Sequence, residues 1–217
     1  MRRPRALGAV LAGGLGTRMG EPKAGVELAG RTLVGRVVAA VGAAGVEPIV
    51  VAKPDTPLPR LDCRVLAEPA EPRHPLCGVI AALSASAGRG IVALACDMPL
   101  VPAKLIAWLA ALEDEAAVCE VDGRMQPLLA RYRPSVTERL VEALERRDSM
   151  RDAVASLHPR IIAEPELQRF GDPQRIAFNV NDPEDLDQAA SLLAGGRGRF
   201  RQVLERPGSA IRRAGTR

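Results

Sequence analysis

A glycine-rich loop with two basic residues is the feature of this sequence that most clearly suggests chemistry. An apolar run over residues 6–12 ends abruptly, and these residues follow it: Gly13, Gly14, Gly16, Arg18, Gly20 and Lys23. Glycines let backbone N–H groups turn toward a bound anion, and Arg18 and Lys23 supply the opposite charge. The chain has lysine only at Lys23, Lys53 and Lys104, so composition does not explain a lysine here. The pattern predicts a polyphosphate site.

Two common phosphate-binding loops do not fit this spacing. A Walker loop needs Lys-Ser or Lys-Thr directly after its last glycine, but Glu21 and Pro22 follow Gly20. A dinucleotide-binding fingerprint needs a third glycine where this chain has Met19. The loop therefore belongs to neither class.

A carboxylate at the end of an apolar strand is the second candidate. The segment 91–95 predicts a strand, and Asp97 follows it. In a parallel sheet the carboxyl ends of the strands line the ligand crevice, which would bring Asp97 to the glycine-rich loop. A carboxylate beside phosphates can hold Mg²⁺, which prefers oxygen ligands. The alternative role for Asp97 is to cap the helix that begins near Pro102.

The elements that must position these residues alternate between strands and helices. We predict strands over 6–12, 48–52, 64–67 and 91–95, and helices over 33–44, 79–87 and 102–112. This order predicts an α/β fold of three layers (α/β/α) with a largely parallel, Rossmann-like sheet. In the C-terminal half, Asp122-Gly123 separates two apolar segments, 117–121 and 127–132, which predicts an antiparallel strand there.

Further local signals mark helix starts and loops in the rest of the chain. Ser149 to Asp152 fits a capping box before a short helix. Asp182-Pro183-Glu184-Asp185 predicts another helix start, with acids at its positive end. Residues 54–59 and 69–75 are predicted loops, and the second is the better candidate for an edge of the active site.

Length and charge limit the classes of protein to consider. The 217 residues suit one domain over residues 1–195, followed by a basic tail over 196–217 that we expect to be solvated and disordered. Much of the net charge of +4 lies in that tail, so the charge of the main domain does not indicate nucleic-acid binding. The scarce aromatic residues, 2% of the chain, predict an aliphatic core.

Cysteine spacing and hydropathy indicate the cellular compartment to expect. The four cysteines show no C-x-x-C spacing and form no metal motif with His74 or His158, which is typical of reduced thiols. The apolar stretch near the N-terminus breaks at Gly13, so we do not expect a secretion signal. No run approaches the roughly 20 apolar residues needed to span a bilayer. We expect a cytoplasmic protein without membrane attachment.

The loop, written L-A-G-G-x-x-x-R-M-G-x-x-K, resembles that of nucleotidyltransferases of the molybdenum cofactor guanylyltransferase type. The resemblance implies that Arg18 and Lys23 hold the triphosphate. It also implies that the first loop residues bind the nucleotide, mostly around its base: Leu11, Ala12, Gly13, Gly14 and Gly16. Family members often carry Ser at the position of Gly16, and Asp or Asn at the position of Pro22. At these positions the loop is more similar to sugar-phosphate and methylerythritol-phosphate nucleotidyltransferases, so the loop leaves the subfamily open.

Three more segments resemble the same family. Cys96-Asp97-Met98-Pro99 is similar to its metal-binding segment, which implies Asp97 as the Mg²⁺ ligand. His74-Pro-Leu-Cys-Gly78 is similar to a turn close to the nucleotide, with His in place of the family's first Gly. The segment 178–186 contains N-x-N-x-P-E-D-L, which implies Asn181, or else Asn179, in the shell of the metal. A helix cap or a turn is the alternative for either asparagine.

Two weaker matches complete the resemblance. Glu68 falls near the place of a family acid that reads the base, and a solvated loop acid is the alternative. Gln126–Tyr132 is similar to a family strand that faces the acceptor. The matches run in family order from Leu11 to Leu186.

The resemblance implies a single domain of the nucleotide-diphosphosugar transferase type and transfer of GMP from GTP to the phosphate of molybdopterin, or its metal-loaded form, with release of pyrophosphate. The acceptor phosphate attacks in line, so no protein nucleophile is needed; Arg18, Lys23 and Asp97 would be catalytic by positioning and charge neutralisation. A molybdoenzyme or a cofactor-delivery protein is the implied partner.

Three alternatives remain open at this point. A cytidylyltransferase acting on the same cofactor would differ in base choice. A sugar-phosphate or methylerythritol-phosphate nucleotidyltransferase would explain Gly16-Thr17-Arg18, but not Cys96-Asp97-Met98-Pro99. A nucleotide-binding adapter without catalysis could use the basic tail for a partner, but binding alone needs no metal ligand such as Asp97.

Overall fold

The computed structural model describes residues 6–13 and 22–195. Three loop residues predicted to bind nucleotide, Gly14, Gly16 and Arg18, lie outside the described residues, as does the tail 196–217. The strands are β1 Ala6–Leu11, β2 Glu27–Leu28, β3 Arg31–Thr32, β4 Glu47–Ala52, β5 Arg64–Ala67, β6 Gly90–Ala95, β7 Ala116–Val121, β8 Arg124–Tyr132 and β9 Arg160–Ile162. The helices are α1 Leu33–Ala43, α2 Pro75–Ser84, α3 Ala103–Ala111, α4 Thr137–Glu145, α5 Met150–Ala155, α6 Glu164–Leu167, α7 Pro173–Ile176 and α8 Pro183–Leu193, with 3₁₀ turns η1 Lys23–Gly25 and η2 Pro134–Val136.

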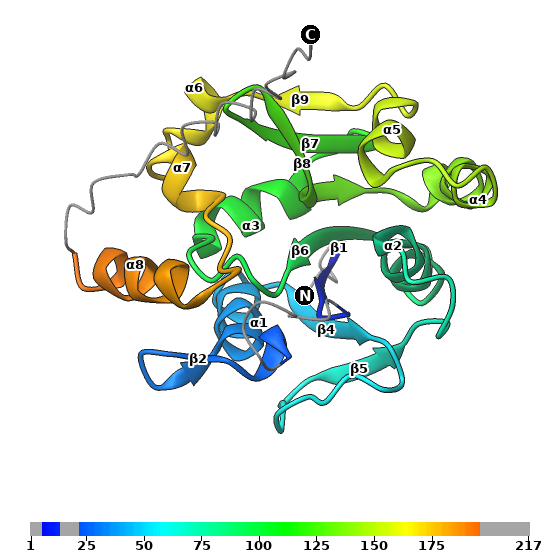
Figure 1. Cartoon of the computed structure of the whole chain (residues 1–217). Coiled ribbons are helices and arrows are strands. Elements are labelled where there is room, and N and C mark those ends of the chain that lie inside the picture. Colours follow the sequence, from blue (N-terminus) through cyan, green and yellow to red (C-terminus); the bar gives the residue numbers. More distant parts are fainter. Residues whose placement is uncertain (1–5, 14–21, 196–217) are drawn as a thin grey trace, which may run out of the picture.

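The main sheet confirms the predicted fold class. Its strand order in the described part of the chain is β5-β4-β1-β6-β8-β7-β9 (Figure 1). Neighbours from β5 to β6 pair in parallel, β8 is antiparallel to both β6 and β7, and β9 is parallel to β7. Only β8 therefore runs against the others in this sheet, in the C-terminal half where the hairpin signal placed such a strand.

The turn chemistry of residues 122–123 explains the reversed strand. Asp122 and Gly123 have φ angles of 51° and 65°, so both are left-handed, as a two-residue turn between twisted strands requires. Val121 pairs with Arg124 across this turn. The pairing is irregular between Val118 and Cys119, near Pro127 of β8, a residue that cannot donate a ladder hydrogen bond.

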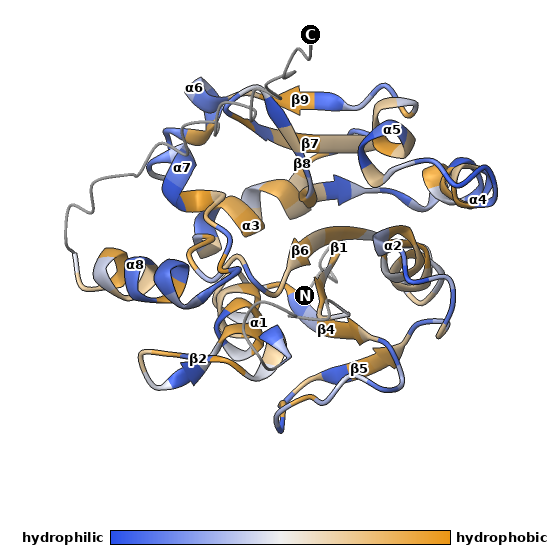
Figure 2. Cartoon of the chain, in the orientation of Figure 1, coloured by the Kyte–Doolittle hydropathy of each residue, from blue (hydrophilic) through white to orange (hydrophobic). Residues whose placement is uncertain are grey.

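Alternating strand residues divide the core between the two faces of the sheet. In β1, Ala6 and Val10 pack against α1 and α3, whereas Leu7 and Ala9 pack on the opposite face with α2, α4 and α5. The central strands are apolar along most of their length (Figure 2), as expected for a parallel sheet covered by helices on both faces.

Helix α2 begins four residues before its predicted start at Val79. His74 caps it, because its Nδ1 accepts a hydrogen bond from the Leu76 N–H at 3.2 Å, and Pro75 occupies the first turn. Proline suits that position because the first N–H groups of a helix have no partner within the helix. The predicted loop therefore ends at His74, and Gly78 lies in the first helical turn beside Leu11 and Glu68. Ser149 caps α5 as predicted, since its Oγ accepts from the Asp152 N–H.

A third, smaller cluster lies beside the main core. It joins β2 and the start of α1 to α8 through Val26, Leu28, Leu33, Val180 and Ala189. The Arg36 guanidinium donates to the backbone carbonyls of Leu28 and Ala29 and holds the β2–β3 hairpin against α1. No helix in the described part of the chain is long and apolar enough to cross a membrane.

Candidate functional site

The parallel strands bring four segments to one edge of the sheet. Gly13, Lys53, Glu68 and Asp97 follow the carboxyl ends of β1, β4, β5 and β6, respectively. Backbone hydrogen bonds continue the pairing past the strand ends, because the Ala12, Glu68 and Cys96 N–H groups donate across neighbouring strands at 2.8–3.0 Å. Residues remote in sequence are thereby fixed at the crevice where such folds bind ligands.

Lys23, Asp97 and Asn181 meet at this edge. The Lys23 Nζ lies 2.8 Å from Asp97 Oδ2 and 2.6 Å from Asn181 Oδ1. The side chains of Lys23 and Asp97 are only 15% and 18% exposed. Three distant segments therefore contribute one cationic and two oxygen-bearing groups to one partly buried cluster.

Local hydrogen bonds hold Asn181 in this cluster. The Val180 N–H donates to the backbone carbonyl of Asp97 at 2.8 Å, and the Asn181 N–H donates to Asp185 Oδ2 at 2.8 Å. Asn179 instead donates its side-chain amide to the Ala177 carbonyl at 2.9 Å.

Neither alternative capping role applies to the residues of this cluster. Pro102 precedes α3 at its N-cap position, and Asp182 caps α8 by accepting from the Asp185 N–H. Asp97 and Asn181 therefore do not serve as the helix caps considered from the sequence.

One oxygen of Asp97 has the surroundings of a metal ligand. Its Oδ1 is buried and has no hydrogen-bond partner among the described residues. A buried carboxylate oxygen without a partner is costly, and a bound cation would satisfy it. Within residues 6–13 and 22–195, no three His, Cys, Asp or Glu residues form a metal cluster. The donor set, one carboxylate and one amide oxygen, fits a Mg²⁺ ion that also takes phosphate and water ligands.

A second group surrounds Glu68. A Cβ atom added to Gly13 would lie 2.7 Å from Glu68 Oε1, and one added to Gly78 would lie 3.1 Å from Oε2 and 2.9 Å from Leu11 Cδ2. Gly13 and Gly78 therefore leave room for the Glu68 carboxylate, which a side chain at either position would meet. The structure brings together four residues that the sequence assigned to the nucleotide: Leu11, Gly13, Glu68 and Gly78. Their contacts with a nucleotide remain a prediction.

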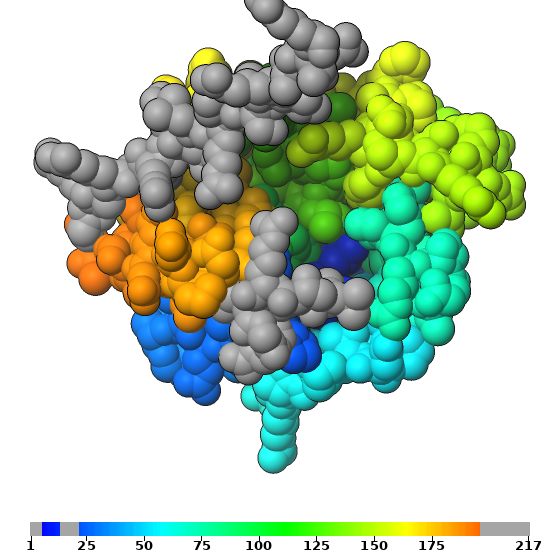
Figure 3. Space-filling view, viewed as in Figure 1, coloured from blue at the N-terminus to red at the C-terminus, as the bar shows by residue number. Residues whose placement is uncertain are grey.

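Glu68 is not the solvated loop acid that was its alternative, since it is only 6% exposed. Burial raises the pKa of its carboxyl, and Lys53 opposes that rise. The surface is hollowed over the end of β1, beside α2 (Figure 3).

Lys53 is the residue of this edge that the sequence reasoning missed. It is 4% exposed, and its Nζ lies 3.8 Å from Glu68 Oε1. The available signal was its position directly after a strand predicted to end at Ala52, the same argument that identified Asp97.

A substitution at Gly13 tests whether Gly13 and Gly78 form a cradle, that is, the space in which the Glu68 carboxylate lies. We expect Gly13→Ala to weaken GTP binding about tenfold, because the added methyl group would meet Glu68 Oε1 at 2.7 Å and the carboxylate must shift away from the position proposed to face the base. Calorimetric titration with GTP measures the change.

Gly42→Ala is the matched control, since no heavy atom lies within 4 Å of the added Cβ in α1. It should keep GTP affinity and gain about 0.5–1 kcal/mol in the free energy of unfolding. Equal GTP affinities of the two variants would contradict the proposed cradle.

The cysteines offer no catalytic nucleophile among the described residues. All four are free thiols. Cys96 adjoins Asp97, but burial raises its pKa to about 12, and the thiolate is the nucleophilic form. Cys96 therefore acts as a small apolar residue in the core.

The chain has the fold of a nucleotidyltransferase. Residues 8–161 match the family model of the MobA-like NTP transferase domain, and the chain belongs to this family. Its relatives include a probable molybdenum cofactor guanylyltransferase of Opitutus terrae, 37% identical over 83% of this chain and 93% of the relative. The molybdenum cofactor guanylyltransferase of Cereibacter sphaeroides is 36% identical over 87% and 97% of the two chains.

Solved structures share the fold. Molybdopterin-guanine dinucleotide biosynthesis protein A from Archaeoglobus fulgidus superimposes with a TM-score of 0.71 at 24% identity, over 86% of this chain and 98% of that one. The 2-C-methyl-D-erythritol 4-phosphate cytidylyltransferase from Thermus thermophilus gives 0.63 at 21%, over 87% and 99%. At these identities the likeness establishes the fold alone.

Proposed function

We propose that this chain transfers GMP from GTP to the terminal phosphate of molybdopterin, or of its metal-loaded form, and releases pyrophosphate. The observation that carries this proposal is the meeting of Lys23, Asp97 and Asn181 at the carboxyl edge of a parallel sheet. Relatives more than 30% identical over most of the chain carry the name molybdenum cofactor guanylyltransferase, which supports the choice of donor and acceptor.

Lys23 and the metal ligands would handle the triphosphate. Lys23 neutralises phosphate oxygens with its ammonium group, together with Arg18 of the glycine-rich loop. Asp97 and Asn181 would hold the divalent ion, for which we propose Mg²⁺; when bound, it neutralises charge on the phosphates. The Lys23 Nζ contacts Asp97 Oδ2 and Asn181 Oδ1, which leaves Asp97 Oδ1 for the divalent ion.

The transfer itself needs no covalent intermediate with the protein. An oxygen of the acceptor phosphate forms a bond to the α-phosphorus of the donor, and the bond from that phosphorus to pyrophosphate breaks. The side chains contribute orientation and charge, and pyrophosphate leaves with the electron pair.

The second group of residues would bind the base. Guanine presents two adjacent donors, N1–H and N2–H₂, and a carboxylate presents two acceptors at a similar spacing. We propose that Glu68 accepts both hydrogen bonds, while Leu11, Ala12, Gly13, Gly14, Gly16 and Gly78 border the base and the rest of the nucleotide. Cytosine lacks this pair of adjacent donors.

Pyrophosphate release tests the function. The protein is assayed with Mg²⁺ and each of GTP, CTP, ATP and UTP, with and without molybdopterin. Release that requires both GTP and molybdopterin supports the proposal, whereas a preference for CTP with that acceptor would identify a cytidylyltransferase. No release with any donor, from folded protein and intact molybdopterin, contradicts it. We also propose that the protein works in the cytoplasm and that its product passes to a molybdoenzyme or a delivery protein.

A further inference from the structure

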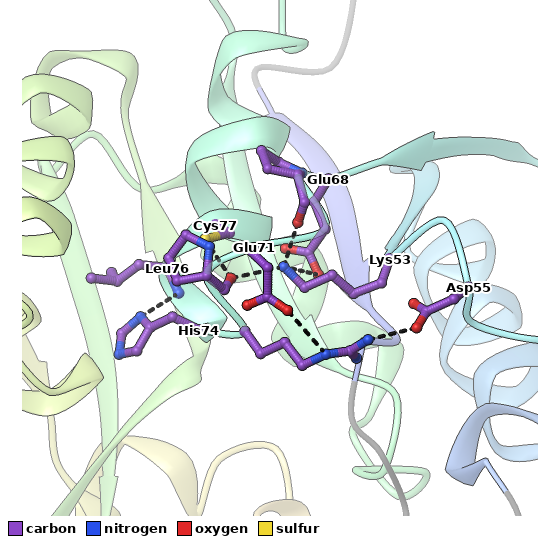
Figure 4. Close-up of polar contacts among 10 residues, drawn as sticks. Lys53, Asp55, Glu68, Glu71, His74, Leu76 and Cys77 are labelled. Carbon is purple, nitrogen blue, oxygen red and sulfur yellow. Dashed lines mark hydrogen bonds and ion pairs between the residues drawn. The ribbon is translucent and has the colours of Figure 1, made fainter.

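Lys53 is a buried lysine that binds three oxygens of a single loop (Figure 4). Its Nζ donates to the backbone carbonyls of Pro69 at 2.5 Å and Pro72 at 3.0 Å, and lies 3.8 Å from Glu68 Oε1. The side chain is 3% exposed, against 6% for Glu68. Lys53 thus joins the end of β4 to the segment that connects β5 with α2.

The Pro72 carbonyl is the centre of this connection. It accepts from Lys53, from the His74 N–H at 2.9 Å, and from the Cys77 Sγ at 3.3 Å. His74 in turn caps α2, the helix that carries Gly78 beside the Glu68 carboxylate. One lysine therefore contacts both the acid and the loop that leads to the helix turn beside it.

The hydrogen bonds to the Pro69 and Pro72 carbonyls explain a donor at this position, and the nearby Glu68 carboxylate explains why that donor carries a charge. Burying an ammonium group carries a desolvation cost that an apolar side chain of similar length avoids. The cost is compensated where a second buried charge needs a partner, and Glu68 is that charge. Ion pairs on the outer side of the loop, from Arg73 to Asp55 and Glu71, are solvent-exposed and are not replacements for Lys53.

We propose that Lys53 is a positioning residue for base recognition, which holds Glu68 and the loop 69–74 so that both carboxylate oxygens meet a base with two adjacent N–H donors. The inference rests on the proposed function, since it assumes that Glu68 faces the base of GTP. Lys53 makes no contact with the triphosphate in this proposal, because it acts through Glu68. Its loss should therefore change the choice of base and leave phosphate binding intact.

Inosine triphosphate, which lacks the 2-amino group of guanine, measures this choice. The affinities for GTP and ITP are determined by calorimetry for the wild type, Lys53→Met, Glu68→Gln and the double variant. We expect the wild type to prefer GTP about tenfold, the order of discrimination from one good bidentate contact. Each of the three variants should bind both nucleotides about equally.

Two measurements separate a positioning role of Lys53 from a general loss of structure at the nucleotide site. Inorganic tripolyphosphate with Mg²⁺ should bind Lys53→Met and the wild type equally. Lys104→Met, which replaces an exposed lysine of α3, is the matched control and should keep the GTP preference. If Lys53→Met fails to fold, the double variant, which removes both charges, is compared with Glu68→Gln alone. Equal GTP affinities of that pair support action through Glu68.

The outcomes distinguish this inference from the function on which it rests. If the wild type does not discriminate GTP from ITP, the base site is wrong and the inference falls with it. If Glu68→Gln loses discrimination but Lys53→Met keeps it, only the role of Lys53 is overturned. A double variant that binds GTP distinctly more weakly than Glu68→Gln also overturns it, because Lys53 would then act independently.

Discussion

Asp97→Asn is expected to lower the rate of nucleotidyl transfer about a thousandfold and to leave the protein folded. Asparagine keeps the shape of the side chain but removes the negative charge that would hold the divalent ion, and such contributions amount to several kcal/mol. The buried Oδ1 without a partner is the atom whose role this variant tests. Pyrophosphate release at saturating GTP and molybdopterin, measured over a range of Mg²⁺ concentrations, checks the result.

Asp187→Asn is the control for this experiment, because Asp187 is an exposed aspartate of α8. It should turn over like the wild type. Equal melting temperatures of the two variants would assign the lost rate to chemistry rather than to folding. Near-normal turnover by folded Asp97→Asn would rule out Asp97 as the essential ligand.

Lys23→Met should lower the rate about a hundredfold, close to 2.7 kcal/mol in the activation free energy. The ammonium group would neutralise triphosphate oxygens, and methionine keeps the length of the side chain without the charge. We expect a higher KM for GTP together with a lower kcat, because the interaction exists before the transition state and strengthens in it.

The metal dependence separates the two variants. Lys23→Met should retain a response to Mg²⁺, because Asp97 and Asn181 remain, whereas Asp97→Asn should lose it. Lys104→Met provides the matched lysine control and should keep wild-type kinetics. A Lys23→Met enzyme with unchanged KM and kcat would show that the contact to Asp97 and Asn181 is structural only.

Much of the fold could be predicted because its signals are local. The strand that ends before Asp97 and the Asp122-Gly123 turn each depend on a few adjacent residues, and the observed elements follow them. The start of α2 was placed too late because its first turn begins with Pro75, and the cap is a histidine rather than a more common capping residue.

The site was predictable only in part, since it depends on contacts between distant segments. The parallel-sheet rule places Asp97 at the ligand edge, and the family resemblance favours Asn181 over Asn179. The structure adds that only Asn181 of the two bonds to Lys23, while Asn179 donates to the Ala177 carbonyl. Lys53 was missed because a lysine after a strand usually reaches into water, and its burial depends on how residues 69–74 fold over it.

The small cluster between β2 and α8 has a consequence for how the protein opens. Lys23 directly precedes the segment that contributes Val26, and Asn181 directly follows Val180. These contacts are far fewer than those of the main core, so this corner should unfold locally at a lower free energy than the sheet. A ligand that contacts both Lys23 and Asn181 would stabilise this cluster against local unfolding. Amide exchange in α8 should therefore be slower when the ligand is bound.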